Sequence, residues 1–241
     1  MSDVFGRQPV LEALRSGQEV NKLLVVKGQR QGSIREILAL AKDLGVVMQE
    51  VDRPVLDKLS AGANHQGVLA QLADVRYWTL AELLAKPHTK DWPPFVLLLD
   101  GIQDPHNLGS ILRSAEAMGV DGVIIPQRRA VGVTGTVMKS SAGAANYVPV
   151  CRVTNLPSTM DTLKKAGYWL VGADMAGDVC YTQNLTGALA LVIGGEGSGL
   201  SRLVKEKCDF LSSIPMRGQI NSLNASVAAA LLMFEVTRQR G

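Results

Sequence analysis

Cysteine is scarce in this sequence: 3 occur in 241 residues, and no two of them form a CxxC pair. An odd number of cysteines, scattered along the chain, predicts neither a disulfide framework nor the paired ligands of a structural zinc site. The histidines also lack metal-ligand spacing, so we expect structural imidazoles, reduced thiols and no bound metal. The residues concerned are Cys151, Cys180 and Cys208, the last expected in the core, and His65, His88 and His106.

Long hydrophobic runs and a strong charge of one sign are missing as well. No apolar stretch is long enough to cross a bilayer, and the start, MSDVFGRQPV, lacks the apolar region of a signal peptide. We therefore expect a soluble, cytoplasmic protein with no membrane partner. The net charge of +3 permits binding to RNA but does not by itself predict it.

Aromatic residues make up only 5% of the chain, whereas hydrophobic residues reach 46% and glycine occurs 24 times. This composition suits an α/β protein with buried parallel strands, and the length is comfortable for two domains. Residues 1–74 are interpreted as a small α/β domain and residues 95–241 as a second one. Residues 75–94, which end in KPHTKDWPP, are interpreted as a linker.

The first domain alternates helices with strands, and Ser33 is expected to cap its second helix. Its loop KGQRQGSIR carries Lys27, Arg30 and Arg35 with no acidic residue among them. These cations are candidates for contacts with RNA phosphates, and an ordinary solvated loop is an equally acceptable interpretation. The expected helices span 9–17, 33–45 and 55–59, and the expected strands span 22–26, 46–51 and 67–73.

The second domain has nearly continuous apolar strands, which are typical of a parallel sheet covered by helices on both faces. Ligands of such sheets bind outside the carboxyl ends of the strands, so the residues that follow each strand are the candidates for function. The expected strands are 95–100, 122–126, 147–151, 168–174, 188–194 and 211–215. Helices are expected at 80–85 in the linker and then at 108–118, 134–144, 158–166 and 200–207.

The first strand end of interest is followed by DPHNLGSILRSAEAMG, in which Asn107 is expected to cap the helix that follows. Arg113 lies inside that helix, and helical side chains lean toward the N-terminus. Its guanidinium could therefore reach a ligand at the helix start. The same residues are also explained by a second interpretation, in which the segment is a capped helix and Arg113 is an ordinary surface arginine.

The second strand end carries the glycine-rich sequence VIGGEGSGLS. It is not a P-loop, because Leu200 stands where the phosphate-binding lysine must be, and the GxGxxG spacing is absent. Glu196 would also repel a pyrophosphate. We expect the glycines to allow close backbone approach to something other than a phosphate chain, with Glu196 as a polar anchor.

The third segment is the C-terminal run IPMRGQINSLNASVAAALLMFEVTR. A turn over 215–219 leads to a polar cluster, Asn221, Ser222, Asn224 and Ser226, at the start of a helix, where unpaired N–H groups invite a ligand. The helix, from 225 to 236, is apolar almost all round, so it must be buried against the rest of the fold, a second copy of the chain, or both.

Together these three segments resemble the three motifs of the SpoU (TrmH-like) RNA 2′-O-ribose methyltransferases of the SPOUT superfamily. FGRQPVLEAL and HQGVLA resemble that family's substrate-binding domain, which is similar to small ribosomal RNA-binding proteins. The resemblance implies a catalytic parallel sheet with a deep trefoil knot, S-adenosylmethionine as cofactor, and a homodimer packed through the knot and the C-terminal helix. Among family members the chain resembles most the bacterial enzymes that methylate a guanosine of 23S ribosomal RNA.

The resemblance also implies site residues. Arg113 is the residue that the resemblance implies for activating the hydroxyl. Because a guanidinium hardly deprotonates and is a poor general base, we interpret Arg113 as a phosphate clamp that stabilises the developing alkoxide. Glu196 would orient Arg113 or the knot loops. The implied catalytic residues are Asn107, Arg113, Glu196, Ser222 and Asn224, and the implied cofactor-binding residues are Gly194, Gly195, Ile214, Met216 and Leu223.

Three alternatives stay open at this point. The same reaction could act on another rRNA or tRNA nucleotide. A kinase-like or dehydrogenase-like nucleotide-binding protein is disfavoured by Leu200 and by the missing fingerprints. A non-catalytic RNA-binding protein is disfavoured by the presence of four residues, namely Asn107, Arg113, Glu196 and Asn224. Arg217 and Gln219 carry no assigned role.

Overall fold

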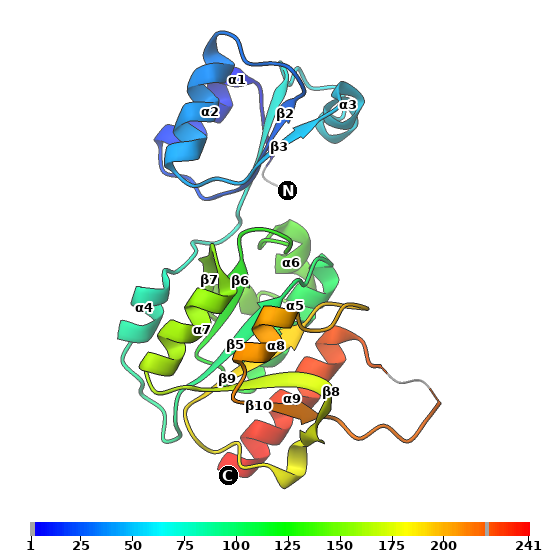
Figure 1. The fold of residues 1–241 in the computed structure, drawn as a ribbon. Helices are drawn as coiled ribbons and strands as arrows, with labels where there is room; N and C mark the ends of the chain where they lie inside the picture. Colours follow the sequence, from blue (N-terminus) through cyan, green and yellow to red (C-terminus); the bar gives the residue numbers. More distant parts are fainter. Residues whose placement is uncertain (1–2, 220–221) are drawn as a thin grey trace. The chain divides into compact units, whose positions relative to one another are not determined.

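The computed structural model describes residues 3–219 and 222–241, and the chain divides into two units (Figure 1). The first unit contains residues 1–76 together with 132–135, and the second contains residues 77–131 and 136–241. Each unit has its own sheet and its own buried core, so each is described by itself.

The first unit is built on a four-stranded mixed sheet in the order β1-β4-β2-β3. Strand β4 is antiparallel to both β1 and β2, whereas β2 and β3 are parallel. The short strand β1 was not expected from the sequence. The elements are β1 (Asp3–Phe5), α1 (Arg7–Arg15), β2 (Val20–Val26), α2 (Ser33–Asp43), β3 (Met48–Val51), α3 (Arg53–Ser60) and β4 (Val68–Leu72).

Helices α1 and α2 cover one face of this sheet and α3 covers the other. The alternation of β2 divides its side chains accordingly: Leu23 and Val25 join the core under α1 and α2, and Leu24 packs with α3. The expected cap at Ser33 is wrong, because Ser33 is already the first helical residue. The N-cap is Gly32, whose φ of 62° suits a residue without a side chain.

The second unit is built on a six-stranded parallel sheet in the order β10-β8-β9-β5-β6-β7. The expectation of a parallel sheet is therefore confirmed. Its strands are β5 (Phe95–Asp100), β6 (Gly122–Pro126), β7 (Val150–Val153), β8 (Trp169–Val179), β9 (Leu189–Gly194) and β10 (Phe210–Ser213). Its helices are α4 (Leu80–Ala85), α5 (Pro105–Ala117), α6 (Gly135–Ser140), η1 (Ala144–Asn146), α7 (Leu156–Lys165), η2 (Cys180–Thr182), α8 (Arg202–Lys207) and α9 (Ala225–Arg240).

Both faces of this sheet are covered, as the apolar strands require. Helices α4, α7 and α8 pack on one face around Val96, Leu98 and Val192. Helices α5 and α9 pack against each other on the opposite side (Figure 1). Leu83 of α4 belongs to the first of these cores, so the segment expected as a linker contributes to the second unit from Tyr77 onward.

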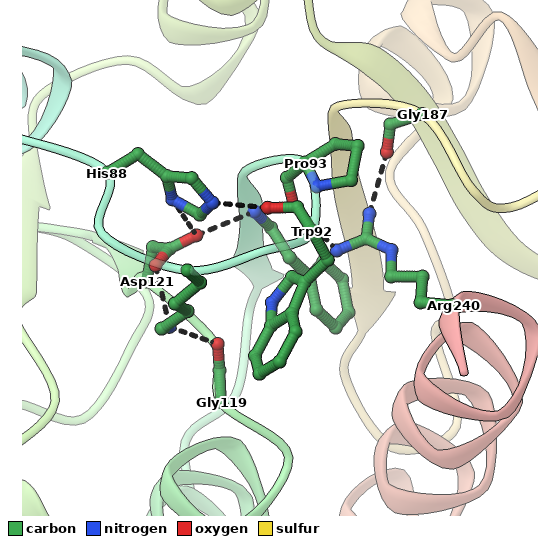
Figure 2. A network of polar contacts seen from close by, with 9 residues as sticks. His88, Trp92, Pro93, Gly119, Asp121, Gly187 and Arg240 are labelled. Atoms are coloured by element: carbon green, nitrogen blue, oxygen red, sulfur yellow. Dashed lines mark hydrogen bonds and ion pairs between the residues drawn. The ribbon is translucent and has the colours of Figure 1, made fainter.

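A polar network holds the chain at the amino ends of the strands in this unit (Figure 2). Asp121, which lies just before β6, accepts a hydrogen bond from the N–H of Phe95 at 2.8 Å and pairs with Lys90 at 2.7 Å. His88 lies 3.5 Å from the same carboxylate and contacts the carbonyl of Trp92. The network has the structural role expected for His88, and it lies at the edge of the sheet opposite the strand ends where ligands bind.

The three thiols are free, in agreement with the expectation of reduced cysteines. Cys208 packs against the core below α8, and burial raises its pKa to about 12. Cys151 is fully buried, and burial together with the charge of Glu82 raises its pKa to about 12 as well. In the described part of the chain, no helix combines the length and apolar character needed to cross a membrane.

Candidate functional site

Three polar side chains from the three sequence motifs meet in one hydrogen-bonded cluster. The amide of Asn107 donates to Oε1 of Glu196 at 2.9 Å, and the amide of Asn224 donates to the same oxygen at 2.6 Å. Asn224 also donates to Oδ1 of Asn107 at 2.9 Å. One carboxylate oxygen therefore joins α5, the loop after β9 and the start of α9. We call these three residues the polar trio.

Asn107 does not cap helix α5, so that expectation is wrong. The helix starts two residues earlier, and its cap is Asp104, whose carboxylate accepts a hydrogen bond from the N–H of His106. Asn107 lies inside the first turn with only 6% of its surface exposed. A buried amide needs partners, and the polar trio supplies them. His106 itself is exposed, whereas His65 is buried and bonded to Asp57, as a structural histidine should be.

Asn224 has a second task at the start of α9. Its side-chain Oδ1 accepts hydrogen bonds from the N–H groups of Ser226 and Val227, so it is the N-cap of the helix. The N–H groups that we expected to face a ligand are thus satisfied within the chain. Capping fixes the oxygen of Asn224, which leaves its amide group directed at Glu196. Ser222 lies beside it in an exposed position, and Asn221 lies outside the described residues.

The glycine-rich segment after β9 folds back on itself. Gly195 and Gly199 form an isolated antiparallel bridge, and the N–H of Gly195 bonds to the carbonyl of Asp100 at 2.8 Å. A Cβ on Gly194 would lie 2.2 Å from the backbone of Gly199, and one on Gly195 would lie 2.6 Å from the carbonyl of Gly101. The close approach that these glycines permit is therefore to the chain's own backbone, which carries Glu196 toward the trio.

A cavity of about 690 Å³ opens beside the polar trio, within the size range of cofactor sites. All five residues implied for cofactor binding line it: Gly194, Gly195, Ile214, Met216 and Leu223. Three of the implied catalytic residues, Glu196, Ser222 and Asn224, line it too. The cavity is lined by glycines, serines and alanines together with larger apolar side chains such as Ile193, Ile214 and Met216.

One wall of the cavity was missed by the sequence interpretation. Between Gly172 and Asp178, strand β8 loses its register with β10, and residues 173–177 form a bulge that brings Asp174 and Met175 to the cavity. Asp174 pairs with Lys205 at 2.8 Å. Burial acts to raise the pKa of Asp174, but hydrogen bonds from Lys205 and Ala176 lower it below its ordinary value. Its position at the end of an expected strand was a signal that could have identified it.

Arg113 is not part of the cluster. Its side chain is exposed, it does not line the cavity, and no hydrogen bond or ion pair of its guanidinium is present within residues 3–219 and 222–241. Glu196 therefore contacts the two asparagines and not Arg113. Of the two roles expected for Glu196, orienting Arg113 and orienting the loops of the site, only the second agrees with these contacts.

The cations expected to contact RNA lie in the first unit. Lys27 pairs with Asp52 at 3.0 Å and Arg30 pairs with Glu50 at 3.1 Å, so acidic residues distant in sequence offset two of the three charges. Both pairs are exposed, and exposed pairs contribute little to stability and exchange readily with other anions. Arg35 is exposed at the start of α2.

Helix α9 buries only one of its apolar faces. Leu232, Met233 and Val236 are buried in the unit, whereas Val227, Leu231 and Phe234 remain 46%, 45% and 54% exposed. These three recur at helical spacing, so they form one apolar face, which we call the open face of α9. Glu235 on the buried side pairs with Arg238 at 2.7 Å, and that bond lowers its pKa.

Family models match both units. The model described as SpoU rRNA Methylase family matches residues 94–234, which contain the polar trio and the cavity. The model described as RNA 2′-O ribose methyltransferase substrate binding matches residues 4–78.

Curated relatives match along nearly the whole chain. A protein of Bacillus subtilis named TrmH family tRNA/rRNA methyltransferase is 48% identical over 239 residues, which cover 98% of this chain and 95% of the relative. A protein of Staphylococcus aureus with the same family name is 51% identical over 239 residues and is covered to 96%. Among solved structures, the SpoU methyltransferase AviRb from Streptomyces viridochromogenes, in complex with AdoMet, matches with a TM-score of 0.62 and 29% identity over 99% of this chain and 90% of that one.

Proposed function

This chain belongs to the SpoU rRNA methylase family, and we propose that it transfers a methyl group from S-adenosylmethionine to the 2′-hydroxyl of a guanosine in 23S ribosomal RNA. The observation that carries the proposal is the polar trio beside the cavity, because it joins the three motif segments of a methyltransferase at the carboxyl edge of the sheet. Methylation of another rRNA or tRNA nucleotide is the second candidate, since relatives are named as tRNA/rRNA methyltransferases.

The cavity fits S-adenosylmethionine in size and chemistry. Its volume of about 690 Å³ suits a nucleoside with an amino-acid tail, and its walls combine glycines, whose peptide groups can bind an adenine by hydrogen bonds, with apolar side chains such as Ile214 and Met216 that can pack against the ring. Asp174 and Glu196 are the carboxylates that line it, which favours a ligand of positive charge. We assign cofactor binding to Gly194, Gly195, Ile214, Met216 and Leu223. When bound, the cofactor supplies a methyl group on a sulfonium centre.

The residues of the chain then have three tasks. The polar trio holds the loop after β9 and the start of α9 in one geometry, so that nucleophile and methyl group are aligned for in-line displacement. Arg113 clamps a phosphate of the substrate and stabilises the alkoxide as it develops. The proton of the hydroxyl leaves to a phosphate oxygen or to water, and Ser222 lies at the rim of the cavity where it can contact the ribose.

The first unit binds the RNA in this proposal. Its match to a substrate-binding model supports that role, and Lys27, Arg30 and Arg35 are the assigned phosphate contacts. We assign the first unit to RNA binding and the second unit, which includes most of the segment expected as a linker, to methyl transfer, with the activity located in the cytoplasm together with its RNA.

Two further features are proposed from the family membership and the exposed residues. The open face of α9 is an apolar surface on a helix, which supports a homodimer packed through α9. The family membership also supports a trefoil knot, formed where the loop after β9 and the segment that follows β10 line one cavity.

The proposal is tested by measuring methyl transfer to RNA that has been isolated from cells lacking the gene. Purified full-length protein is incubated with labelled S-adenosylmethionine and either the ribosomal or the transfer RNA fraction, and the modified ribose is mapped. Incorporation at one guanosine of 23S RNA supports the proposal, and incorporation into tRNA favours the second candidate. Absence of incorporation into either fraction, with RNA binding retained, would leave a non-catalytic RNA-binding protein.

A further inference from the structure

Two adjacent arginines lie in the loop that follows β6. This loop, residues 127–131, we call the basic loop; Arg128 and Arg129 are both exposed. Neither side chain has a hydrogen bond or an ion pair within the described ranges 3–219 and 222–241. Other cations in those ranges are offset by an acidic side chain, namely Arg15, Lys27, Arg30, Lys90, Lys164, Arg202, Lys205, Lys207 and Arg238.

The backbone of the basic loop is held at both ends. The N–H of Gln127 bonds to the carbonyl of Val153 at 2.8 Å, and the N–H of Val131 bonds to the carbonyl of Ile102 at 2.9 Å. Between these anchors Arg129 has a φ of 59°, a left-handed conformation that an arginine rarely adopts. Strained residues of this kind persist only where the surroundings hold them, and they gather at ligand sites. The two charges are thus carried on a fixed backbone.

The basic loop lies at the same edge of the sheet as the polar trio. The carbonyl of Arg129 is 4.0 Å from the position of a Cβ on Gly101, and the carbonyl of Gly101 is 2.6 Å from the position of a Cβ on Gly195. Gly195 directly precedes Glu196. The turn after β5 therefore contacts the backbone of the basic loop as well as the backbone of the loop that carries Glu196.

We propose that Arg128 and Arg129 bind the phosphate backbone of the RNA strand beside the target ribose, and so position that ribose at the cavity. The inference rests on the proposed function, because a ribose inside an RNA strand has a phosphate on each side. Arginine suits this task since its planar guanidinium donates two parallel hydrogen bonds to one phosphate. Their lack of acidic partners leaves both groups free to make them. Arg128 and Arg129 act here as positioning residues.

The test is a double variant of the full-length protein, Arg128→Gln with Arg129→Asn. Asparagine tolerates the left-handed conformation, so the loop keeps its backbone while it loses two charges. The matched control is Lys86→Gln with Lys165→Gln, which removes the same charge from segments that lead into the amino ends of β5 and β8. Binding is measured with labelled poly(U) over a series of salt concentrations, and methylation is measured with the RNA fraction that accepts methyl groups.

We expect the double variant to bind poly(U) about 10-fold more weakly or worse, and to lose about 1.4 from the slope of log affinity against log salt, because two single-strand phosphate contacts are lost. KM for RNA rises, while affinity for S-adenosylmethionine and the response of the control stay at the wild-type level. The single variant Arg128→Gln gives half the change in slope if the double variant folds poorly. Wild-type affinity and slope in a folded variant would overturn the inference. Failure of the wild type to methylate RNA would instead refute the proposed function, and the poly(U) measurement would still decide this inference.

Discussion

The side-chain amide of Asn224 donates to the carboxylate of Glu196 at 2.6 Å, while its oxygen caps helix α9. This single asparagine thus connects the start of the last helix to the loop after β9. The arrangement makes Glu196 an acceptor shared by two amides, and it predicts that loss of this acceptor affects fold and site together.

Replacing Glu196 with alanine removes the acceptor of both amides in the polar trio. Because Asn107 is buried, its amide would be left without that partner, and we expect a loss of about 1–3 kcal/mol in the free energy of unfolding. Methyl transfer should fall with it. Glu196→Gln, whose side-chain oxygen can accept the same bonds, should recover most of the stability. Denaturant unfolding of the three proteins checks this, and equal stability of Glu196→Ala and wild type would contradict it.

Gly195 tolerates no side chain. A Cβ there would lie 2.6 Å from the carbonyl of Gly101, so Gly195→Val should displace the loop and abolish binding of S-adenosylmethionine while the first unit stays folded. Even alanine should weaken the affinity. Gly218→Ala is the matched control, because no atom lies within 4 Å of the added group and its φ is not positive. Calorimetric titration of the cofactor distinguishes the variants, and unchanged affinity in Gly195→Val would show that the cofactor binds elsewhere.

Arg113 is expected to act in turnover and not in cofactor binding. If it clamps phosphate and stabilises the alkoxide, Arg113→Ala should lose about 10²-fold or more in kcat, as does removal of one preorganised donor. Arg113→Lys should recover only part of the lost kcat, since the ammonium group of lysine cannot donate two parallel hydrogen bonds as a planar guanidinium does. Because Arg113 does not line the cavity, cofactor affinity should survive in both variants. Wild-type turnover of Arg113→Ala under saturating RNA and cofactor would remove it from the mechanism.

Leu231 tests whether the open face of α9 is covered by a second chain. An unpaired carboxylate buried in an apolar interface costs several kcal/mol, so Leu231→Asp should give monomers or aggregates. Leu203→Asp on α8 is the control, because that leucine is 52% exposed and lies outside α9. Light scattering after size-exclusion chromatography reports the molecular mass. A soluble, active dimer of Leu231→Asp would exclude this interface.

The ion pair of Asp174 predicts a pH dependence. Hydrogen bonds from Lys205 and Ala176 outweigh burial and lower the pKa of Asp174 in the folded state. A carboxyl group of this kind stabilises the fold above its unfolded pKa, and the contribution is lost as the pH falls through the folded pKa. Asp174→Asn should therefore lower Tm at neutral pH, and its difference from wild type should shrink below about pH 4. A difference that stays constant into that range would contradict the assignment.

The sequence by itself determined the class of fold and the identity of most site residues. The bounds expected for β5 and β6 match the structure, because short runs such as FVLLLD and GVIIP are almost entirely apolar, as is typical of strands in a buried parallel sheet. The sequence VIGGEGSGLS matches neither the P-loop nor the GxGxxG pattern, which excluded these two common kinds of nucleotide-binding site. Three motif segments, read by resemblance, indicated the residues that line the cavity.

Tertiary structure alone decided how those residues are used. Asn107 looked like a helix cap, yet a partner 89 residues away in Glu196 makes it a buried member of the polar trio. The bulge that brings Asp174 to the cavity arises from pairing between β8 and β10, which no local pattern encodes. The basic loop is held against the turn after β5 because the N–H of Val131 bonds to the carbonyl of Ile102. Local sequence propensity determines where helices and strands form. The geometry of a site depends on residues that are distant in sequence, because hydrogen bonds and packing act between neighbours in space.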